Sequence, residues 1–148
     1  MKKLEKAKSG LFCLLLVLAV FVLLTACSSK AATATDKIEL GQKYLTELNY
    51  TEAVASFTEA IKLDPDNIQA YMGRAEAYMA LGEYDKALES YSFALNFAPL
   101  AVPILLDRAA IYMETGRTDR AYTDYCRVLD EDKQNKEALL MRAYIYIL

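Results

Sequence analysis

Residues 68–99 read IQAYMGRAEAYMALGEYDKALESYSFALNFAP, and two helical patterns within this stretch meet at Leu81-Gly82-Glu83. The first pattern follows one helical face through Tyr71, Arg74, Ala75 and Tyr78. The second does the same through Ala87, Tyr91, Ala94 and Leu95. Because glycine readily adopts the left-handed conformation that ends a helix, Gly82 predicts a tight turn between two helices.

The same pattern recurs along the chain, since Ala75 lies 34 positions after Gly41 and 34 before Ala109. Six residues before the stretch fall on counterparts within it: Gly41, Tyr44, Ala53, Phe57, Ala60 and Pro65. Downstream, the matching positions are Ala109, Tyr112, Gly116, Ala121 and Tyr125, followed by Arg142, Ala143 and Tyr146. A fixed period of this length is typical of arrays of helix–turn–helix units.

From about residue 34 to the end, these positions resemble the tetratricopeptide repeat (TPR) family over roughly three and a half repeats. The resemblance implies an all-α fold, in which stacked hairpins form a TPR-type α-solenoid. One domain at 36–148 would hold repeats at about 34–67, 68–101, 102–135 and, in part, 136–148. Small residues recur where the helices of a hairpin must approach closely: Gly41/Ala53, Ala75/Ala87 and Ala109/Ala121. Aromatic residues recur where a ring must fill the gap between hairpins: Tyr44, Phe57, Tyr78, Tyr91, Tyr112 and Tyr125.

Local signals set the expected helix boundaries, at about 36–47, 50–63, 68–80, 84–96, 103–114 and 118–131, with another helix from about 136. We expect Asn49 and Asn67 to cap the helices that follow them. Pro103 suits a first turn, where its missing N–H is not needed. Gly116 should repeat the role of Gly82. Leu48 stands at that place in the first repeat, so its turn is expected to be less regular.

Charge and composition limit the possible chemistry. Formal net charge is −3, and residues 1–26 contribute +3 through four Lys and one Glu, so the remainder carries −6. An acidic body argues against a nucleic-acid partner held through its phosphates. The sequence contains no His, which excludes His-based triads, and its carboxylates lack EF-hand spacing. We therefore expect no metal, no cofactor and no small-molecule substrate.

The N-terminus has the pattern of a secretion signal over residues 1–26. Four lysines within residues 2–8 precede an uncharged run, residues 11–26, which is shorter than the ~20 residues of a membrane span. The run ends in Leu24-Thr25-Ala26-Cys27, which resembles a bacterial lipobox. The resemblance implies cleavage before Cys27 and a diacylglyceryl group on its sulfur; an uncleaved anchor is the alternative. Both place the rest of the chain outside the cytoplasm, on the periplasmic or extracellular side of the cell membrane.

A short tether would join this anchor to the repeats. Residues 28–35 read SSKAATAT, a small and polar segment without a helical pattern. Eight residues span at most ~28 Å when extended, so residues 27–35 would keep the repeats close to the membrane.

The last helix of the array lacks a partner within this sequence. It begins near Lys136 and ends in Ala143-Tyr144-Ile145-Tyr146-Ile147-Leu148, which is apolar and aromatic. Because terminal repeats need a polar outer face for solubility, we expect either a longer natural chain or a partner that covers this face. Self-assembly through this helix is a further possibility.

The first helices of stacked hairpins line the concave side, which in this family usually binds an extended peptide or a partner helix. The resemblance assigns partner binding to ten residues: Ile38, Gln42, Leu45, Gln69, Met72, Glu76, Met79, Leu106, Ala110 and Met113. Methionines adapt to varied ligands. The alternative is that several of these side chains only pack between neighbouring helices.

One TPR subclass clamps a C-terminal carboxylate with cations and amides on this side. The corresponding positions here hold Ile38, Gln42, Gly73, Pro103 and Asp107, so cations are missing and a like charge is present. We therefore do not expect a clamp of this kind. Arg74, Arg108 and Arg142 form a ladder that could bind phosphates, but we favour pairing with neighbouring acids or stacking on tyrosines.

Two classes of function follow. Cys13 would leave with the signal and Cys27 would be lipidated, so Cys126 would be the remaining thiol, without a His to activate it. Residues 28–148 show no nucleophile–base pair, so we expect no enzyme and no catalytic residue within them. We interpret the protein as a membrane-anchored interaction scaffold at the bacterial cell envelope. The alternative is the targeting portion of a longer envelope protein or enzyme whose further domain lies beyond Leu148.

Overall fold

The computed structural model describes residues 34–147, and within this range the chain is helical without strands. Residues 34–46 are helical. The helices that follow are α2 (Tyr50–Leu63), α3 (Ile68–Ala80), α4 (Tyr84–Phe97), α5 (Val102–Glu114), α6 (Thr118–Glu131) and α7 (Lys136–Ile145). Their bounds agree with the predicted ones to within about a residue, and the predicted all-α solenoid is confirmed. The predicted signal sequence, Cys27 and most of the tether lie outside the described residues. Residues 34 and 35, predicted as the end of the tether, belong to the first helix, which therefore begins two residues earlier than predicted.

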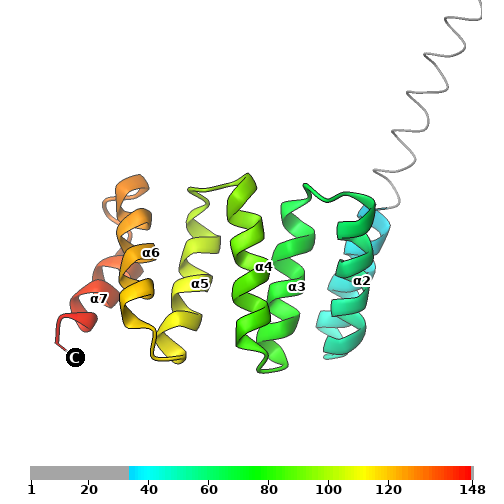
Figure 1. Ribbon diagram of the computed structural model, residues 1–148, viewed down its shortest axis with the longest axis horizontal. Coiled ribbons are helices and arrows are strands. Elements are labelled where there is room, and N and C mark those ends of the chain that lie inside the picture. Colours follow the sequence, from blue (N-terminus) through cyan, green and yellow to red (C-terminus); the bar gives the residue numbers. More distant parts are fainter. Residues whose placement is uncertain (1–33, 148) are drawn as a thin grey trace, which may run out of the picture.

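Consecutive helices run antiparallel and stand side by side in a row from α2 to α7, with the helix of residues 34–46 behind α2 (Figure 1). Turns alternate between the two ends of the array, so every helix packs against the next one along the chain. Each odd-numbered helix therefore begins at the same end of the molecule, and the even-numbered helices end there.

The repeated small residues and four of the six repeated aromatic residues are buried in the core, as predicted, whereas Tyr44 and Tyr78 are half-buried and pack against it. The alanines at the helix crossings are completely buried, namely Ala53, Ala75, Ala87, Ala109 and Ala121. Phe57, Tyr91 and Tyr125 occupy the same place in successive repeats and are at most 3% exposed. A ring buried in this way stabilises the fold by roughly 1.5–3 kcal/mol.

The Phe57 ring explains why two neighbouring positions hold glycine. A Cβ atom on Gly41 would lie 2.8 Å from the Phe57 ring, and one on Gly73 would lie 2.3 Å from it. Both distances are below van der Waals contact, so the ring fits between the first two hairpins because these positions lack side chains.

The turns follow the predicted chemistry at most positions. The Asn67 side chain accepts a hydrogen bond from the backbone N–H of Ala70 at 3.2 Å, which confirms it as a cap. Asn49 does precede α2, but its side chain makes no capping bond; its amide lies 3.5 Å from Glu47 instead. Gly82 and Gly116 have φ values of 73° and 72°, as their roles require.

The turn at Leu48 corrects one expectation, because it is as regular as the other two. Leu48 has a φ of 61°, and the backbone N–H of Asn49 donates to the carbonyl oxygen of Tyr44 at 2.8 Å. Equivalent bonds run from Glu83 to Tyr78 and from Arg117 to Tyr112. The period of the array imposes this turn, so Leu48 adopts a left-handed conformation that costs a leucine about 1–2 kcal/mol.

Candidate functional site

The residues predicted to bind a partner come from the odd-numbered helices. On α3, Gln69, Met72, Glu76 and Met79 follow one another at intervals of three or four residues, which places them on a single face. On α5, Leu106, Ala110 and Met113 do the same. The helix of residues 34–46 contributes the remaining three: Ile38, Gln42 and Leu45.

These ten residues divide into three groups by exposure. Four are exposed and available for contact: Gln42, Gln69, Glu76 and Ala110. Five are half-buried and pack against the core while keeping an open side: Leu45, Met72, Met79, Leu106 and Met113. Ile38 is only 9% exposed and belongs to the core cluster around Phe57, so little of its side chain is left for a partner.

A polar junction lies beside Met79, and the sequence pattern did not indicate it. The Tyr91 hydroxyl on α4 lies 3.4 Å from a carboxylate oxygen of Asp107 on α5 and 3.6 Å from the sulfur of Met79 on α3. Burial, followed by the charges of Asp107 and Glu76, raises the pKa of Tyr91. Tyr91 therefore remains a neutral donor at physiological pH and joins three helices at the proposed binding face.

Asp107 is held in an unfavourable place for a carboxylate. Partial burial raises its pKa, the hydrogen bond from Tyr91 lowers it, and the nearby charge of Glu137 on α7 raises it, with a net increase. Glu137 did not figure among the predicted binding residues. It lies on the helix after α6, where only the packing of successive hairpins brings it near Asp107.

The arginine ladder is structural at two of its three positions, which confirms the favoured interpretation there. Arg108 donates to both carboxylate oxygens of Asp124, at 2.8 Å and 2.7 Å, and to the Ser92 hydroxyl at 3.0 Å. Arg74 donates to the Ser90 hydroxyl at 3.1 Å. Each of these bonds links the two helices of its own hairpin, and in both cases the bonded residues are 16 positions apart in the sequence.

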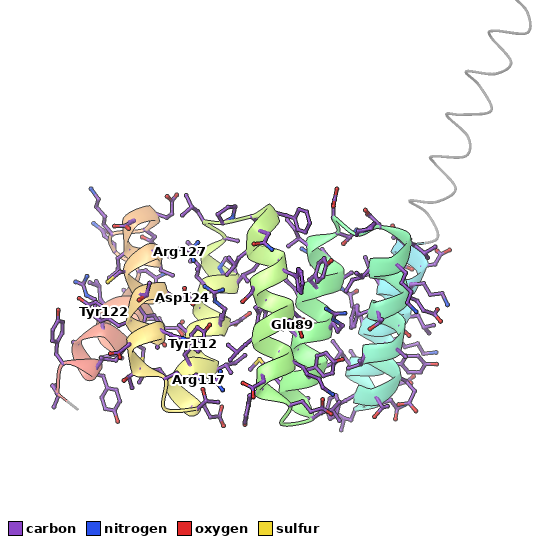
Figure 2. The ribbon with its side chains drawn as sticks, viewed as in Figure 1. Glu89, Tyr112, Arg117, Tyr122, Asp124 and Arg127 are labelled. Carbon is purple, nitrogen blue, oxygen red and sulfur yellow. The ribbon has the colours of Figure 1, made fainter. Side chains whose placement is uncertain are left out.

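The Asp124 carboxylate is the centre of the third hairpin's polar cluster. It is 3% exposed, and Arg127 approaches it from the following helical turn at 3.5 Å. The labelled side chains of Tyr112, Asp124 and Arg127 lie together where α5 and α6 face each other (Figure 2). The Arg108 guanidinium also lies 5.8 Å from the centre of the Tyr112 ring. Asp124 therefore neutralises the cations that a phosphate would need.

The end of the array at α7 differs from the earlier hairpins. Arg142 has neither a hydrogen-bonded nor an ion-paired partner among the described residues. Leu140, Tyr144 and Tyr146 are 69%, 49% and 75% exposed, which confirms the predicted apolar outer face.

Other groups in the described range carry no recognisable chemistry. Cys126 is half-buried, and its neighbour Tyr122 meets the hydroxyl of Tyr146 at 2.8 Å. Residues 34–147 hold no cluster of three or more acidic or cysteine side chains suited to a metal ion. In that same range, none of the helices combines the length and the apolar character needed to traverse a bilayer.

Comparison with known proteins agrees with this architecture. Residues 38–102 and residues 102–135 match the family described as Tetratricopeptide repeat. Hsp70-Hsp90 organizing protein 3 from Arabidopsis thaliana is 41% identical over 49 residues, which cover 33% of this chain and 9% of that protein. The chain thus matches less than a tenth of the length of that relative.

Solved structures resemble the whole array. One is the first TPR of Spaghetti (RPAP3) bound to the HSP90 peptide SRMEEVD, with a TM-score of 0.72 and 27% identity. The similarity covers 78% of this chain and 92% of that one. Another is a tetratricopeptide repeat protein from Parabacteroides merdae, with the same TM-score and identity, covering 76% of this chain and 44% of that one.

Proposed function

Because the chain belongs to the tetratricopeptide repeat family, whose hairpin arrays act as protein-interaction adaptors, we propose that it is a lipid-anchored adaptor of the bacterial cell envelope. It holds a peptide or a helix of a partner protein against the face formed by residues 34–46, α3 and α5. The fold supplies a rigid scaffold, and the exposed residues of these helices supply the contacts.

The half-buried methionines carry this proposal. Met72, Met79 and Met113 are fixed on one side by the core and remain open on the other. A partly exposed apolar row on rigid helices can bury surface on association without paying for its own ordering. Because Met side chains change shape at little cost, the row can fit a partner helix closely.

The lipid anchor rests on the sequence before the repeats. The uncharged run before Leu24-Thr25-Ala26-Cys27 supports export and acylation, and Cys27 would then carry the diacylglyceryl group. Two or three acyl chains hold a protein stably on a membrane, since each buried CH₂ contributes about 0.8 kcal/mol. With a short tether, the binding face stays within a few nanometres of the bilayer.

A tail such as the peptide bound to the Spaghetti domain is not the partner we propose for this chain. That peptide contains two adjacent glutamates and an aspartate. Asp107 and Glu76 on the proposed face would repel such a tail, and the five positions that correspond to the clamp hold no cation.

Affinity capture from envelope extracts tests the binding face. Replacing Met72 and Met79 with Glu places charge in the apolar row, and we expect capture of the partner to fall at least tenfold while helical circular dichroism is kept. The matched control is Phe93→Glu and Phe97→Glu on α4, which also places two charges on partly exposed apolar residues. If the methionine variant and the phenylalanine variant capture the partner equally well, the proposed binding face is ruled out. If the methionine variant loses helicity instead, Met72 and Met79 are core residues.

A further inference from the structure

The binding face carries both apolar and acidic side chains, and on α3 Glu76 lies between Met72 and Met79. Four half-buried residues pack against the core and are here called the methionine row: Met72 and Met79 on α3 and Leu106 and Met113 on α5. Three carboxylates from successive hairpins accompany this row: Glu76 on α3, Asp107 on α5 and Glu137 on α7. All three residues are exposed, although neighbouring groups partly desolvate the Asp107 carboxylate.

Contacts and mutual influence show that these carboxylates are neighbours. The Tyr91 hydroxyl touches Asp107 and the sulfur of Met79, which places the carboxylate at the edge of the methionine row. Glu76 acts on the same hydroxyl from α3, and Glu137 acts on Asp107 from α7. These three carboxylates, here called the acidic border, therefore accompany the methionine row across three hairpins.

The described range offers this border no paired cation. None of the three carboxylates forms an ion pair there. The arginines of α3 and α5 point into the hairpins instead, where Arg74 meets Ser90 and Arg108 meets Asp124. On α7, Arg142 stands at the repeat position of those two arginines and forms no ion pair with Glu137. Lys136 is next to Glu137 in the sequence, but consecutive side chains of a helix point roughly 100° apart, so the two do not pair.

We propose that the partner segment is a cationic amphipathic helix, with Lys or Arg flanking an apolar stripe. Its apolar side chains lie on the methionine row, and its cations pair with Glu76, Asp107 and Glu137. This inference rests on the binding face of the proposed function and adds the chemistry of the partner. An acidic or a neutral segment leaves the three carboxylates unpaired at the edge of the interface, which opposes its binding.

Binding of two model helices to the full-length protein tests the proposal. The probes are a fluorescent amphipathic peptide of alanine, leucine and lysine and a second peptide with every lysine replaced by glutamate. The protein is held in phosphatidylcholine nanodiscs, and empty nanodiscs give the background. We expect the lysine peptide to bind about tenfold more tightly than the glutamate peptide, since three exposed ion pairs each contribute a factor of roughly two to three. Its affinity should fall as salt is added.

Two triple variants assign the effect to the border. We expect E76Q/D107N/E137Q to lose about tenfold in affinity for the lysine peptide. The control variant E52Q/E89Q/E131Q removes the same charge from exposed positions on α2, α4 and α6 and should bind like the wild type. Circular dichroism confirms that both variants are folded.

The outcomes separate this inference from the proposed function. Equal binding of the two peptides, stronger binding of the glutamate peptide, or equal effects of the two triple variants would overturn the cationic partner. If the glutamate peptide binds and M72E/M79E weakens it, the face still binds partners and only the charge preference is wrong. If neither peptide binds, the cationic partner is overturned, and the face itself is judged by partner capture with M72E/M79E.

Discussion

At the scale of single residues, the array imposes its period on side chains that do not suit it. Leu48 has a positive φ of 61° in a turn where the other repeats use glycine, and its side chain is 69% exposed. The sequence shows that Leu48 stands where another repeat has Gly82, but it does not show whether the turn at Leu48 keeps the same conformation. Local preference favours a changed turn, whereas the hydrogen bonds at the helix end favour a strained leucine, and the hydrogen bonds prevail.

Leu48→Gly should therefore stabilise the protein. Relief of the left-handed strain is partly offset by the greater flexibility of glycine in the unfolded chain, so we expect a gain of about 0.5–1 kcal/mol. Urea unfolding measures it. The reciprocal change, Gly82→Leu, should destabilise, and a loss of stability in Leu48→Gly would show that the exposed leucine makes a contact worth more than its strain.

Gly73→Ala should be destabilising in spite of the better helix propensity of alanine. Its Cβ would lie 2.3 Å from the Phe57 ring, so the ring must move, at a cost of about 1–3 kcal/mol. Adding Phe57→Leu should make the alanine less costly than it is alone, because the smaller side chain leaves room. Additive effects in a double-mutant cycle would contradict this steric account.

At the scale of elements, hairpins two and three are each linked by an arginine of the first helix that bonds a side chain of the second helix, but the accepting group differs. Arg74 meets the hydroxyl of Ser90, whereas Arg108 meets the buried carboxylate of Asp124 at the same spacing. The helix boundaries followed from periodicity, since each depends on nearby residues. The polar links could not be assigned, because a 34-residue repeat of arginine does not reveal which group faces it across the hairpin.

Arg108→Met should destabilise the protein much more than Arg74→Met. Removing Arg108 leaves the Asp124 carboxylate buried with only Arg127 near it, and breaking such a pair costs about 3–5 kcal/mol. Removing Arg74 leaves a serine hydroxyl that still donates to the backbone oxygen of Lys86, so the loss should be about 1 kcal/mol. Thermal unfolding of the two variants provides the comparison, and equal losses would show that Asp124 is solvated when Arg108 is absent.

Asp107 should make stability depend on pH in the direction opposite to that of a paired carboxylate. Its pKa is raised by burial and by Glu137, so the folded state binds the proton more tightly than the unfolded state does. Its contribution is most favourable below the ordinary carboxyl pKa and is lost as pH rises to the raised value. We expect Asp107→Asn to raise the urea midpoint at pH 7 and to have a smaller effect near pH 3. A lower midpoint at pH 7 would mean that the Tyr91 bond outweighs burial.

At the scale of the whole molecule, stacking turns local helices into a face that the sequence indicated only in part. The repeat positions identified Gln69, Glu76 and Ala110 as exposed residues of that face, and the structure agrees on their exposure. Burial of Ile38 depends on Phe57 from the next helix, and the meeting of Asp107 with Glu137 depends on how two hairpins stack. Such contacts arise from packing between repeats, which single-helix periodicity does not specify.

The lipid anchor that we propose belongs to the same scale, because an anchor at Cys27 would set where the face works. Cys27→Ala should abolish incorporation of labelled palmitate, since no acylated cysteine would remain at this position. Cys126→Ala serves as the control and should keep its label. Continued labelling of Cys27→Ala would exclude acylation at this cysteine.

The most direct test of the binding face is photo-crosslinking in living cells, with a photoreactive amino acid placed at one position at a time. Gln69 and Ala110 lie on α3 and α5 and are exposed, whereas Glu89 is an exposed residue of α4 that Figure 2 labels. We predict that Gln69 and Ala110 give the same crosslinked partner, identified by mass spectrometry, and that Glu89 does not. A partner captured from Glu89 but from neither Gln69 nor Ala110 would contradict the account.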